Sequence, residues 1–501
     1  MKKISSLIFL LISLISIAQK KNDPSVYAKT INADDLKKHL FIIAGKEMQG
    51  RETASEGQRK AAGYIENHFR SLGLLPGNNG SYQMNFPVYL DSLISTSIEI
   101  NGSSYQLDQD FTTGVSQNNN SNYRFSEIVF VGNGRADSLQ NDYLGLDVHG
   151  KAVLVLGSPR TLREGSRFPN PKLEAAQKNG AIAILYVGSN FPKTSKTNPK
   201  GDMYLNAFQR SIRPNQFIIS EKMAEAIMGE DFAKTKNGII QAKTYTASVK
   251  LEFSKYSIAL YSSNVMGLLE GTDLKDQYVF VTAHYDHLGK KDTVIWYGAD
   301  DDGSGTVAVL EMAEAFAKAK AAGKGPKRSM IFMTVSGEEK GLLGSEYYSN
   351  HPAYPLEKTT VDLNIDMIGR SDATRKQGDS TNYVYVVGDD KLSSDLKTIS
   401  ESTNKKYTNL ELDYKFNDPR DPYQIYFRSD HYNFAEKGVP VIFYYDGMLG
   451  ADYHKPTDTP DKINYALLSK RAQLVFYTAW DMANRNDMLK RDLILIKPKG
   501  F

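Results

Sequence analysis

The stretch from Gln277 to Gly305 is rich in side chains that bind divalent metals. A hydrophobic run ends in His284, Asp286 follows closely, and the aspartates 300, 301 and 302 come before a Gly-Ser-Gly turn. Imidazole and carboxylate groups are usual ligands of zinc in proteins. The residue types therefore indicate a divalent metal site at the end of this hydrophobic run.

Groups of the same types follow other hydrophobic runs. Glu338 and Glu339 come after one run, Asp366 ends the next, and His454 lies in a later loop. The glutamate pair alone would suit the N-terminus of a helix, where the helix dipole favours negative charge. The single histidine would suit an ordinary loop. Their joint placement after successive runs indicates one site assembled from distant parts of the chain.

The aspartate cluster also fits a calcium-binding loop. Five residues occupy positions 1, 3, 5, 6 and 12 of an EF-hand loop: Asp300, Asp302, Ser304, Gly305 and Glu311. Such a loop needs a helix before it, whereas residues 292–299 are rich in β-branched and aromatic residues and favour a strand. We therefore favour the site assembled from several strands over a calcium loop.

Alternating strands and helices must position these groups. Strands are predicted at 279–284, 329–336, 360–366, 383–388 and 439–445, and helices at 304–320, from 341, near 391–403 and at 466–484. This alternation predicts an α/β fold with a mixed, largely parallel sheet flanked by helices. Ligands of such sheets bind at the carboxyl ends of the strands, which is where the candidate residues lie.

A separate α/β pattern precedes this region. Strand patterns at 150–159 and 180–188 surround a predicted helix at 171–178, and the polar run 118–122 indicates a boundary before them. The arrangement resembles a protease-associated domain, a smaller α/β or β-rich module inserted into several exopeptidase families. The resemblance implies a lid or a wall at the substrate entrance, with no chemistry of its own.

Length and charge limit the class of protein. A chain of 501 residues suits about two or three domains. Its net charge of +3 gives no sign of nucleic-acid or membrane-surface binding. The absence of cysteine excludes thiolate ligands, disulfides and a lipid anchor on cysteine. The oligomeric state stays open.

The N-terminus has the pattern of a secretory signal. Lys2 and Lys3 precede an apolar run, Ile4 to Ile17, which predicts a signal peptide over 1–18 with cleavage before Gln19. A signal anchor is the alternative. We expect an exported protein, periplasmic or secreted, without a stable membrane anchor.

Five motifs resemble, in their order along the chain, those of the M28 family of di-zinc exopeptidases, many of which are aminopeptidases. The motifs are AHYDHLG, GADDDGSG, SGEEKGLLGS, NIDMIG and YHKPTDTPDKI, and the stretch EMQGRETASEGQRKAAGYI is similar to the start of such chains. The resemblance places a zinc-exopeptidase domain, of the phosphorylase/hydrolase-like fold, at 24–115 and 255–501. The protease-associated domain is expected at 116–254.

The resemblance implies two Zn²⁺ per chain and a ligand set for each ion. One ion would be bound by His284, Asp366 and Asp301, and the other by Glu339, His454 and the same Asp301. Two histidines and three carboxylates carry little net charge once two zinc ions are bound, and they leave positions for water and substrate.

Further residues are expected to support the chemistry. Asp286 matches the carboxylate that orients the first histidine, and Glu338 matches the general base that takes a proton from water. Tyr453 is a candidate donor to the oxyanion, with packing on the pocket wall as the alternative. The family also implies a cis peptide bond at Asp301-Asp302.

Several other residues receive weaker expectations. His287 is expected to be structural, with support of the metal ligands as the alternative. His39 and His68 are expected to pack within helices. Arg428 and Tyr432 are candidates for the wall of the substrate site.

These expectations combine into a zinc-dependent aminopeptidase that acts on peptides. A carboxypeptidase or a glutaminyl cyclase-like enzyme on the same fold would share the ligands. A non-catalytic peptidase-like binding module is the third alternative, but it would lack ligands or the base, and both are present.

Overall fold

The computed structural model of the chain describes residues 23–116, 118–157, 170–188, 191, 196–206, 212–238 and 241–495. The predicted signal peptide, 1–18, lies outside the described residues. The chain forms two compact units. The first contains the described residues up to Phe86 and from Tyr261 onward, and the second is Pro87–Leu260. Each unit is described by itself.

Four helical segments open the first unit: α2 (Ser25–Ala28), α3 (Ala33–Ile43), η1 (Lys46–Arg51) and α4 (Glu56–Ser71). The side chain of Asn32 caps α3 by accepting hydrogen bonds from two backbone N–H groups, and the side chain of Ser55 caps α4 by accepting one from the N–H of Gln58. Apolar residues at helical spacing bury one face of α4. His39 lies in α3 and His68 in α4, so their expected placement within helices is confirmed.

The sheet of the first unit has the order β17-β16-β18-β15-β11-β14-β10. Its strands are β10 (Lys243–Leu269), β11 (Leu274–His284), β14 (Arg328–Val335), β15 (Thr359–Ile365), β16 (Tyr383–Val387), β17 (Glu411–Asp413) and β18 (Val441–Tyr445). Pairing is parallel from β14 through β11 and β15 to β18, and antiparallel where β10 meets β14 and β16 meets β18. The predicted mixed, largely parallel sheet is confirmed.

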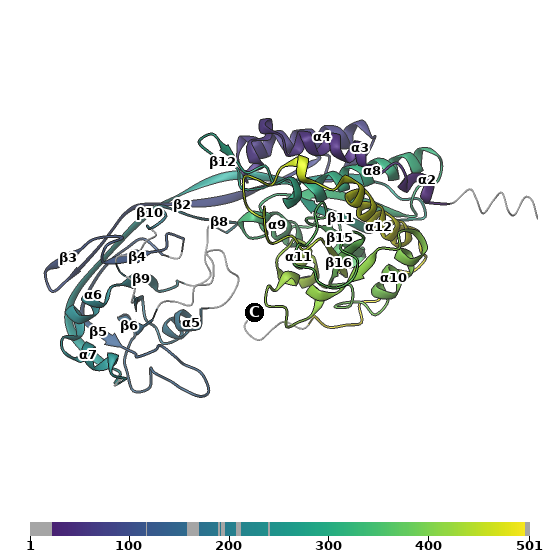
Figure 1. The fold of residues 1–501 in the computed structure, drawn as a ribbon. Helices are drawn as coiled ribbons and strands as arrows, with labels where there is room; N and C mark the ends of the chain where they lie inside the picture. The colour runs from purple at the N-terminus through teal and green to yellow at the C-terminus, as the bar shows by residue number, and fades with distance from the viewer. Residues whose placement is uncertain are drawn as a thin grey trace, which may run out of the picture. The chain divides into compact units, whose positions relative to one another are not determined.

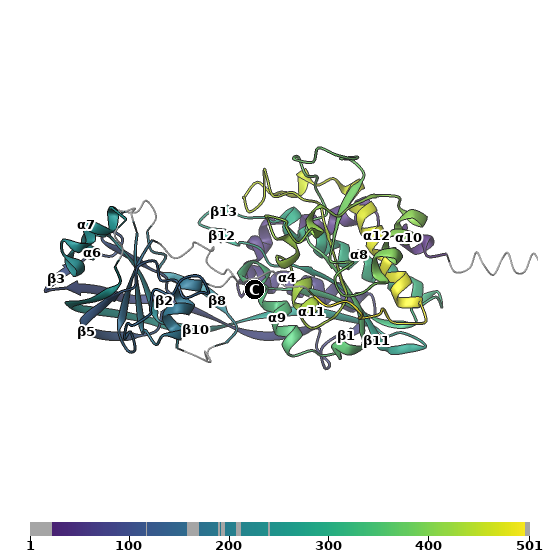
Figure 2. The ribbon, with the colours of Figure 1, turned by 90° about the horizontal axis from the view of Figure 1, so that it is seen from below.

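Helices cover both faces of this sheet (Figure 1). The longer ones are α8 (Gly305–Ala321), α9 (Leu343–Asn350), α10 (Leu396–Tyr407), α11 (His431–Glu436) and α12 (Tyr465–Asn484). Alternate residues of β11 divide between two cores: Val279 and Val281 pack with α3, α8 and α12, whereas Phe280 packs with α9 and α11. The two views in Figures 1 and 2 place α10 beside α12.

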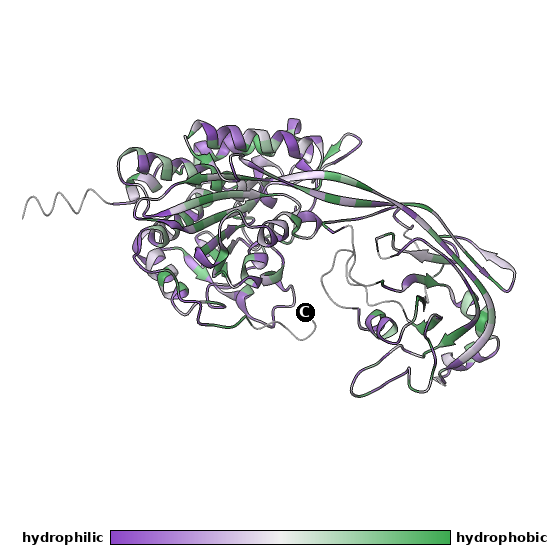
Figure 3. Cartoon of the chain, turned by 180° about the vertical axis from the view of Figure 1, so that it is seen from behind, coloured by the Kyte–Doolittle hydropathy of each residue, from purple (hydrophilic) through white to green (hydrophobic). Residues whose placement is uncertain are grey.

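Hydropathy follows this layering. The central strands of the first unit are drawn mainly in green, for hydrophobic residues, and the helices that cover them carry both green and purple (Figure 3). Strand β14 is buried along its whole length, as expected for a parallel strand covered on both faces. The strands that end at the carboxyl edge of the sheet are therefore well packed and rigid.

Short elements complete the first unit. They are β1 (Leu75–Pro76), β12 (Lys290–Lys291), β13 (Val294–Ile295), η2 (Ala299–Ser304), η3 (Glu338–Lys340), η4 (Leu356–Lys358), η5 (Lys415–Asn417), η6 (Ile425–Phe427) and η7 (Pro460–Lys462). Two of them carry candidate site residues: η2 contains Asp301, and η3 contains Glu338 and Glu339.

The second unit pairs its strands in parallel in the order β5-β6-β7-β9, with β4 antiparallel beside β9. Its elements are β2 (Gln83–Ile100), β3 (Ser103–Tyr105), β4 (Phe111–Thr113), β5 (Ser121–Phe130), β6 (Ala152–Leu156), α5 (Pro171–Lys178), β7 (Ala183–Val187), β8 (Lys200–Tyr204), β9 (Asn215–Ile219), α6 (Glu221–Met228) and α7 (Asp231–Lys236). The predicted strand, helix and strand at 150–188 are present.

The boundaries of this unit differ from those predicted for the insert. The unit begins at Pro87 instead of 116, because Ile98 and Ile100 of β2 are buried in its hydrophobic core. It ends at Leu260, close to the predicted end at 254. The assignment of this unit as a protease-associated domain stays a prediction.

Candidate metal centre

Three neighbouring strands deliver side chains to one edge of the sheet. Strand β11 ends at His284, which pairs in parallel register with Val335, the last residue of β14. Asp366 directly follows β15, which is also parallel to β11. Glu338 begins the short helix η3 after β14. The predicted assembly of the site at the carboxyl ends of the strands is confirmed.

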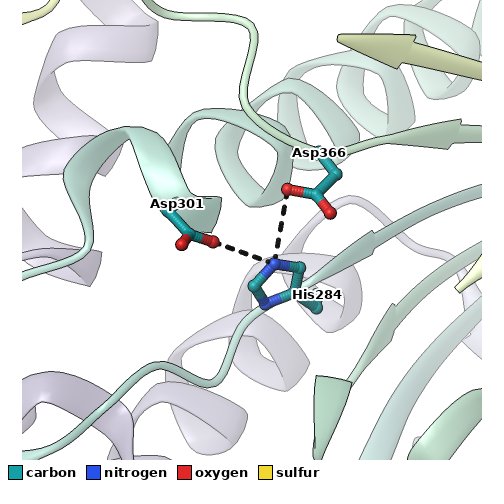
Figure 4. A group of neighbouring side chains, drawn as sticks. All are labelled: His284, Asp301 and Asp366. Carbon is teal, nitrogen blue, oxygen red and sulfur yellow. Dashed lines mark ion pairs between the residues drawn. The ribbon is translucent and has the colours of Figure 1, made fainter. Parts of the chain in front are cut away.

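One group of possible metal ligands gathers around His284 (Figure 4). Its Nε2 atom lies 3.2 Å from Oδ1 of Asp301 and 3.5 Å from Oδ1 of Asp366. All three side chains are buried. Two carboxylates therefore face a single imidazole nitrogen, and these are the three residues that the family resemblance implies for one ion.

A second group shares Asp301 with the first. Oδ2 of Asp301 lies 3.1 Å from Nε2 of His454, and the same nitrogen lies 3.1 Å from Oε2 of Glu339. The two oxygens of Asp301 thus face two different histidines, His284 and His454. The peptide bond Asp301-Asp302 is cis, as the family resemblance implies.

His287 belongs to this second group as well. Its Nδ1 atom lies 2.8 Å from Oε1 of Glu339 and 4.0 Å from Oδ2 of Asp301, and its ring is fully buried. The expectation of a purely structural histidine placed it outside the site. The available signal was its position three residues after His284, in the loop that begins at the carboxyl end of β11.

Several atoms of the two groups are buried without a hydrogen-bond partner. They are Nε2 of His284, both ring nitrogens of His287, Oδ2 of Asp301 and Oε1 of Glu339. Buried polar atoms are rarely left unpaired, because their desolvation is costly. Imidazole nitrogens and carboxylate oxygens that approach one another without bonding fit a shared divalent cation, and this donor set suits zinc.

Opposite charges within the cluster shift its pKa values. Burial by itself lowers the pKa of His454, but the carboxylates of Asp301 and Glu339 outweigh it and raise the pKa to about 10. Burial raises the pKa of Asp301, but the close imidazole groups of His284 and His454 overcome this effect, so the pKa falls well below its usual value. The cluster therefore favours an ionised bridging carboxylate.

Asp286 is oriented differently from its predicted role. Nδ1 of His284 donates to the backbone carbonyl of Asp286 at 3.1 Å, whereas the carboxylate Oδ1 is 3.7 Å away. That carboxylate accepts hydrogen bonds from the hydroxyl of Thr53 at 2.6 Å and from the backbone N–H of Glu338 at 3.2 Å. The carbonyl, rather than the carboxylate, fixes the ring so that Nε2 faces the metal ligands.

Glu338 lies beside both groups without being part of either. Its Oε2 atom is 3.9 Å from Nε2 of His284. Burial raises the pKa of Glu338 well above its usual value; His284 lowers it, and the neighbouring Glu339 and Asp366 raise it further. A carboxylate with a raised pKa next to a metal site is able to take up a proton.

Tyr453 lines a cavity together with Glu338, Asp301 and Asp366. Its ring stacks on His454, with the ring centroids 3.9 Å apart, and its hydroxyl accepts a hydrogen bond from Nη2 of Arg428 at 3.0 Å. Burial raises its pKa well above the usual value. Tyr453 thus presents a protonated hydroxyl beside the metal groups, so the geometry allows the predicted donor role.

The remaining aspartates of the triplet hold the surrounding loops. Oδ1 of Asp300 accepts a hydrogen bond from the N–H of Gly369, and Oδ1 of Asp302 accepts from the N–H groups of Gly305 and Met367. Because Met367 directly follows Asp366, these bonds tie the loop after β15 to the triplet. Asp300 and Asp302 thus fix the backbone around Asp301.

The calcium-loop alternative is excluded by the position of Glu311. This residue lies inside helix α8, and its Oε1 atom faces Nε2 of His39 at 3.4 Å. A calcium loop would need its carboxylate to turn toward Asp300 and Asp302. Those carboxylates instead accept backbone hydrogen bonds.

Two residues that support the site lie within the quoted motifs but received no role from them. Arg51 is fully buried and donates hydrogen bonds to four backbone carbonyls. Two of them, those of Tyr285 and Gly298, lie at the two ends of the loop that leads from β11 to Asp301. Asp458 accepts hydrogen bonds from the backbone N–H groups of Asp300 and Asp301. Both residues fix the loop that carries the shared aspartate.

The family model of peptidase family M28 matches residues 264–479, the segment that carries both groups and Glu338. This segment belongs to peptidase family M28. The family predicted from the five motifs is therefore confirmed.

Curated relatives agree with this assignment to family M28. A probable leucine aminopeptidase of Arthroderma otae (strain ATCC MYA-4605 / CBS 113480) is 30% identical over 217 residues, 42% of this chain and 56% of the relative. Aminopeptidase YwaD of Bacillus subtilis (strain 168) is 25% identical over 266 residues, 51% of this chain and 50% of the relative. The chain thus spans about half the length of the curated relatives it matches.

Solved structures share the fold over nearly the whole length. The aminopeptidase from Aneurinibacillus sp. strain AM-1 has a TM-score of 0.58 at 20% identity and covers 95% of this chain and 98% of its own. BSAP, a zinc aminopeptidase from Bacillus subtilis, has a TM-score of 0.51 at 20% identity, covering 93% and 98%. These likenesses confirm the fold class.

A helix that crosses a membrane must be both long and apolar. Within the described ranges of the chain, none is both long and apolar enough to do so.

Proposed function

We propose that this chain is an exported aminopeptidase that binds two zinc ions and releases N-terminal residues from peptides. The observation that carries the proposal is the position of Asp301, whose two carboxylate oxygens face His284 and His454 at 3.2 and 3.1 Å. The membership of residues 264–479 in peptidase family M28 supports it. So do the aminopeptidases among its relatives and structural neighbours.

Each zinc ion has its own set of ligands around the shared Asp301. The first ion is assigned to His284, Asp301 and Asp366. The second ion is assigned to Glu339, His454 and His287, together with the shared Asp301. Zinc ions bound here would supply the charge that polarises the scissile carbonyl and activates a water molecule.

Glu338 is the proton carrier in this proposal. Its raised pKa suits a group that accepts a proton from water and returns it to the leaving amine. Asp286 holds the backbone N–H of Glu338 and so fixes the start of the short helix that carries the base. Tyr453 donates its hydroxyl hydrogen to the oxygen of the scissile carbonyl as negative charge develops there.

A small peptide panel tests the activity. The zinc-loaded protein is incubated with peptides that have a free N-terminus, a blocked N-terminus or a blocked C-terminus, and the products are identified by mass spectrometry. We expect stepwise loss of residues from free N-termini whether or not the C-terminus is blocked. Cleavage that requires a free C-terminus would contradict the proposal and favour a carboxypeptidase.

Export is tested separately from activity. The proposal expects the mature protein, expressed from the full-length gene, to begin at Gln19 after cleavage of residues 1–18. N-terminal sequencing of the protein from periplasm or medium measures this directly. Recovery of the uncleaved chain in the cytoplasm would remove export from the proposal and leave the peptidase chemistry untouched.

A further inference from the structure

One cation lines the cavity beside Glu338 within a wall that is otherwise acidic, phenolic and apolar. The cavity is lined by Asp301, Glu338, Asp366 and Tyr453 on one side and by apolar groups, including Phe443 and Leu449, elsewhere. The side chain of Arg428 completes this lining. The guanidinium of Arg428 therefore lies in the cavity that a substrate must enter to reach Glu338, the proposed base.

Arg428 has no anionic partner among the described residues. The only hydrogen bond of its side chain there is from Nη2 to the neutral hydroxyl of Tyr453 at 3.0 Å, and no carboxylate pairs with the guanidinium within 4.0 Å. The side chain is nevertheless half-buried. A guanidinium offers five N–H donors in a planar fork that matches a carboxylate. Most of that capacity is therefore left for a group that comes from outside the chain.

The backbone around Arg428 is well fixed. Its N–H donates to the carbonyl of Ile425 at 3.0 Å, and the next residue, Ser429, is fully buried and accepts a hydrogen bond from Asn364 of β15 at 2.9 Å. Helix α11 begins just after it. The arginine is thus presented from a rigid segment, and little order has to be gained when a ligand binds.

We propose that Arg428 binds a carboxylate of the peptide substrate, so that the enzyme prefers peptides with an N-terminal Asp or Glu. This inference rests on the proposed aminopeptidase function. The apolar walls suit the methylene groups of an acidic side chain, and the guanidinium suits its end. A C-terminal carboxylate has the same chemistry, and it is the second source that the experiment must separate.

The first arm uses amino-acid p-nitroanilides, which have no C-terminal carboxylate. The expected kcat/KM for the glutamyl substrate exceeds that for the glutaminyl substrate by about 10- to 100-fold, the range that charge-assisted hydrogen bonds provide. Arg428→Met should abolish the difference, and Arg428→Lys should restore part of it. The matched control is Arg420→Met, at an exposed arginine paired with Asp418, which should keep the preference.

The second arm uses N-acetylated dipeptides with a free or an amidated C-terminus. If the wild type cleaves only the dipeptides with a free C-terminus and Arg428→Met loses this cleavage, Arg428 binds the C-terminal carboxylate of the substrate. That result would overturn both the N-terminal preference and the proposed aminopeptidase function. Equal losses on all substrates in Arg428→Met would show that the arginine only positions Tyr453, and this result would overturn the inference while the aminopeptidase function stands.

A binding measurement separates the two proposals if turnover is absent. L-Glutamate and L-glutamine are titrated into the zinc-loaded protein by calorimetry. Tighter binding of glutamate by at least about 10-fold, lost in Arg428→Met, would support the carboxylate site even where the proposed activity fails. Equal binding of the two amino acids would overturn it.

Discussion

The carboxylate of Asp286 accepts a hydrogen bond from the backbone N–H of Glu338 at 3.2 Å, and so links the loop after β11 to the loop after β14. The backbone carbonyl of the same aspartate accepts a hydrogen bond from His284. One residue therefore orients a metal ligand with its main chain and the proposed base with its side chain. This double contact leads to the first prediction.

Asp286→Asn should lower turnover more than it lowers metal binding. Asparagine keeps the backbone carbonyl that orients His284, but it replaces a charged acceptor for Glu338 N–H and the Thr53 hydroxyl with an amide. We expect kcat to fall by about 10- to 100-fold, the usual range for residues that orient metal-site groups. Steady-state kinetics and metal content measure the two effects. A loss of zinc larger than the loss of kcat would show that the carboxylate mainly serves the metal site.

Glu338→Gln should remove the proton carrier and keep the metal. The amide has nearly the same shape but cannot accept the proton of water. We expect kcat to fall by about 10²- to 10⁴-fold, with zinc content equal to that of the wild type by elemental analysis. A variant that keeps wild-type turnover would contradict the role of Glu338 as base.

His287→Asn should weaken the second zinc site selectively. The variant removes the ring nitrogen that lies 2.8 Å from Glu339, so we expect one of the two ions to be lost to a chelator at least about 10-fold more readily. Glu339→Gln should weaken the same ion. The control is His351→Gln, at an exposed histidine.

Chelator competition followed by cobalt absorption spectra measures this difference between the sites. Unchanged affinity for both ions in His287→Asn would contradict the assignment of His287 as a ligand. Circular dichroism identifies a variant that has failed to fold, and in that case Glu339→Gln decides whether the second group binds an ion.

The buried His431 should make stability depend on pH. Burial lowers its pKa to about 3, so it stays neutral in the folded chain while the unfolded chain takes up a proton below about pH 6.5. More protons are then bound in the unfolded state, and the stability that this neutral histidine contributes is lost as the pH falls. The loss amounts to about 3 kcal/mol at pH 4.

The test compares wild type with His431→Gln, which removes this titration and retains a donor for the carbonyl of Tyr426. As the pH falls from 6.5 to 4, the free energy of unfolding of the variant should rise relative to that of the wild type by about 1.4 kcal/mol per pH unit. Urea denaturation across this range measures it. A difference that is constant with pH would contradict the buried neutral histidine, and His351→Gln should show no such trend.

Much of the fold could be predicted from the sequence, and the ligand set stays a prediction. His284 and Asp366 end hydrophobic runs, and parallel strands place such ends at one edge, so pattern and position together predicted their proximity. The motif order added the shared Asp301 and Glu339. The proximity of His284 and Asp366 could be predicted because one ends a strand and the other directly follows one, where the backbone leaves little freedom.

The remaining features depend on side-chain directions and long-range contacts that no local pattern encodes. His287 turns toward Glu339 because the loop after β11 curves back, and its spacing alone does not give that direction. Arg51 bonds to the carbonyl of Tyr285, which lies 234 positions later in the chain. The carboxylate of Asp286 faces Glu338 rather than the imidazole of His284, although both contacts fit the same motif.

Zinc content against activity, measured in wild type and in Asp301→Asn, tests the central claim most directly. The metal-free protein is titrated with zinc while hydrolysis of a free-N-terminal peptide is followed. Full activity is predicted at about two zinc ions per chain, and Asp301→Asn is predicted to lose bound zinc and activity together because both sites share this carboxylate. Full activity at one ion per chain, or an Asp301→Asn variant that keeps two ions at wild-type affinity, would contradict the shared two-zinc centre.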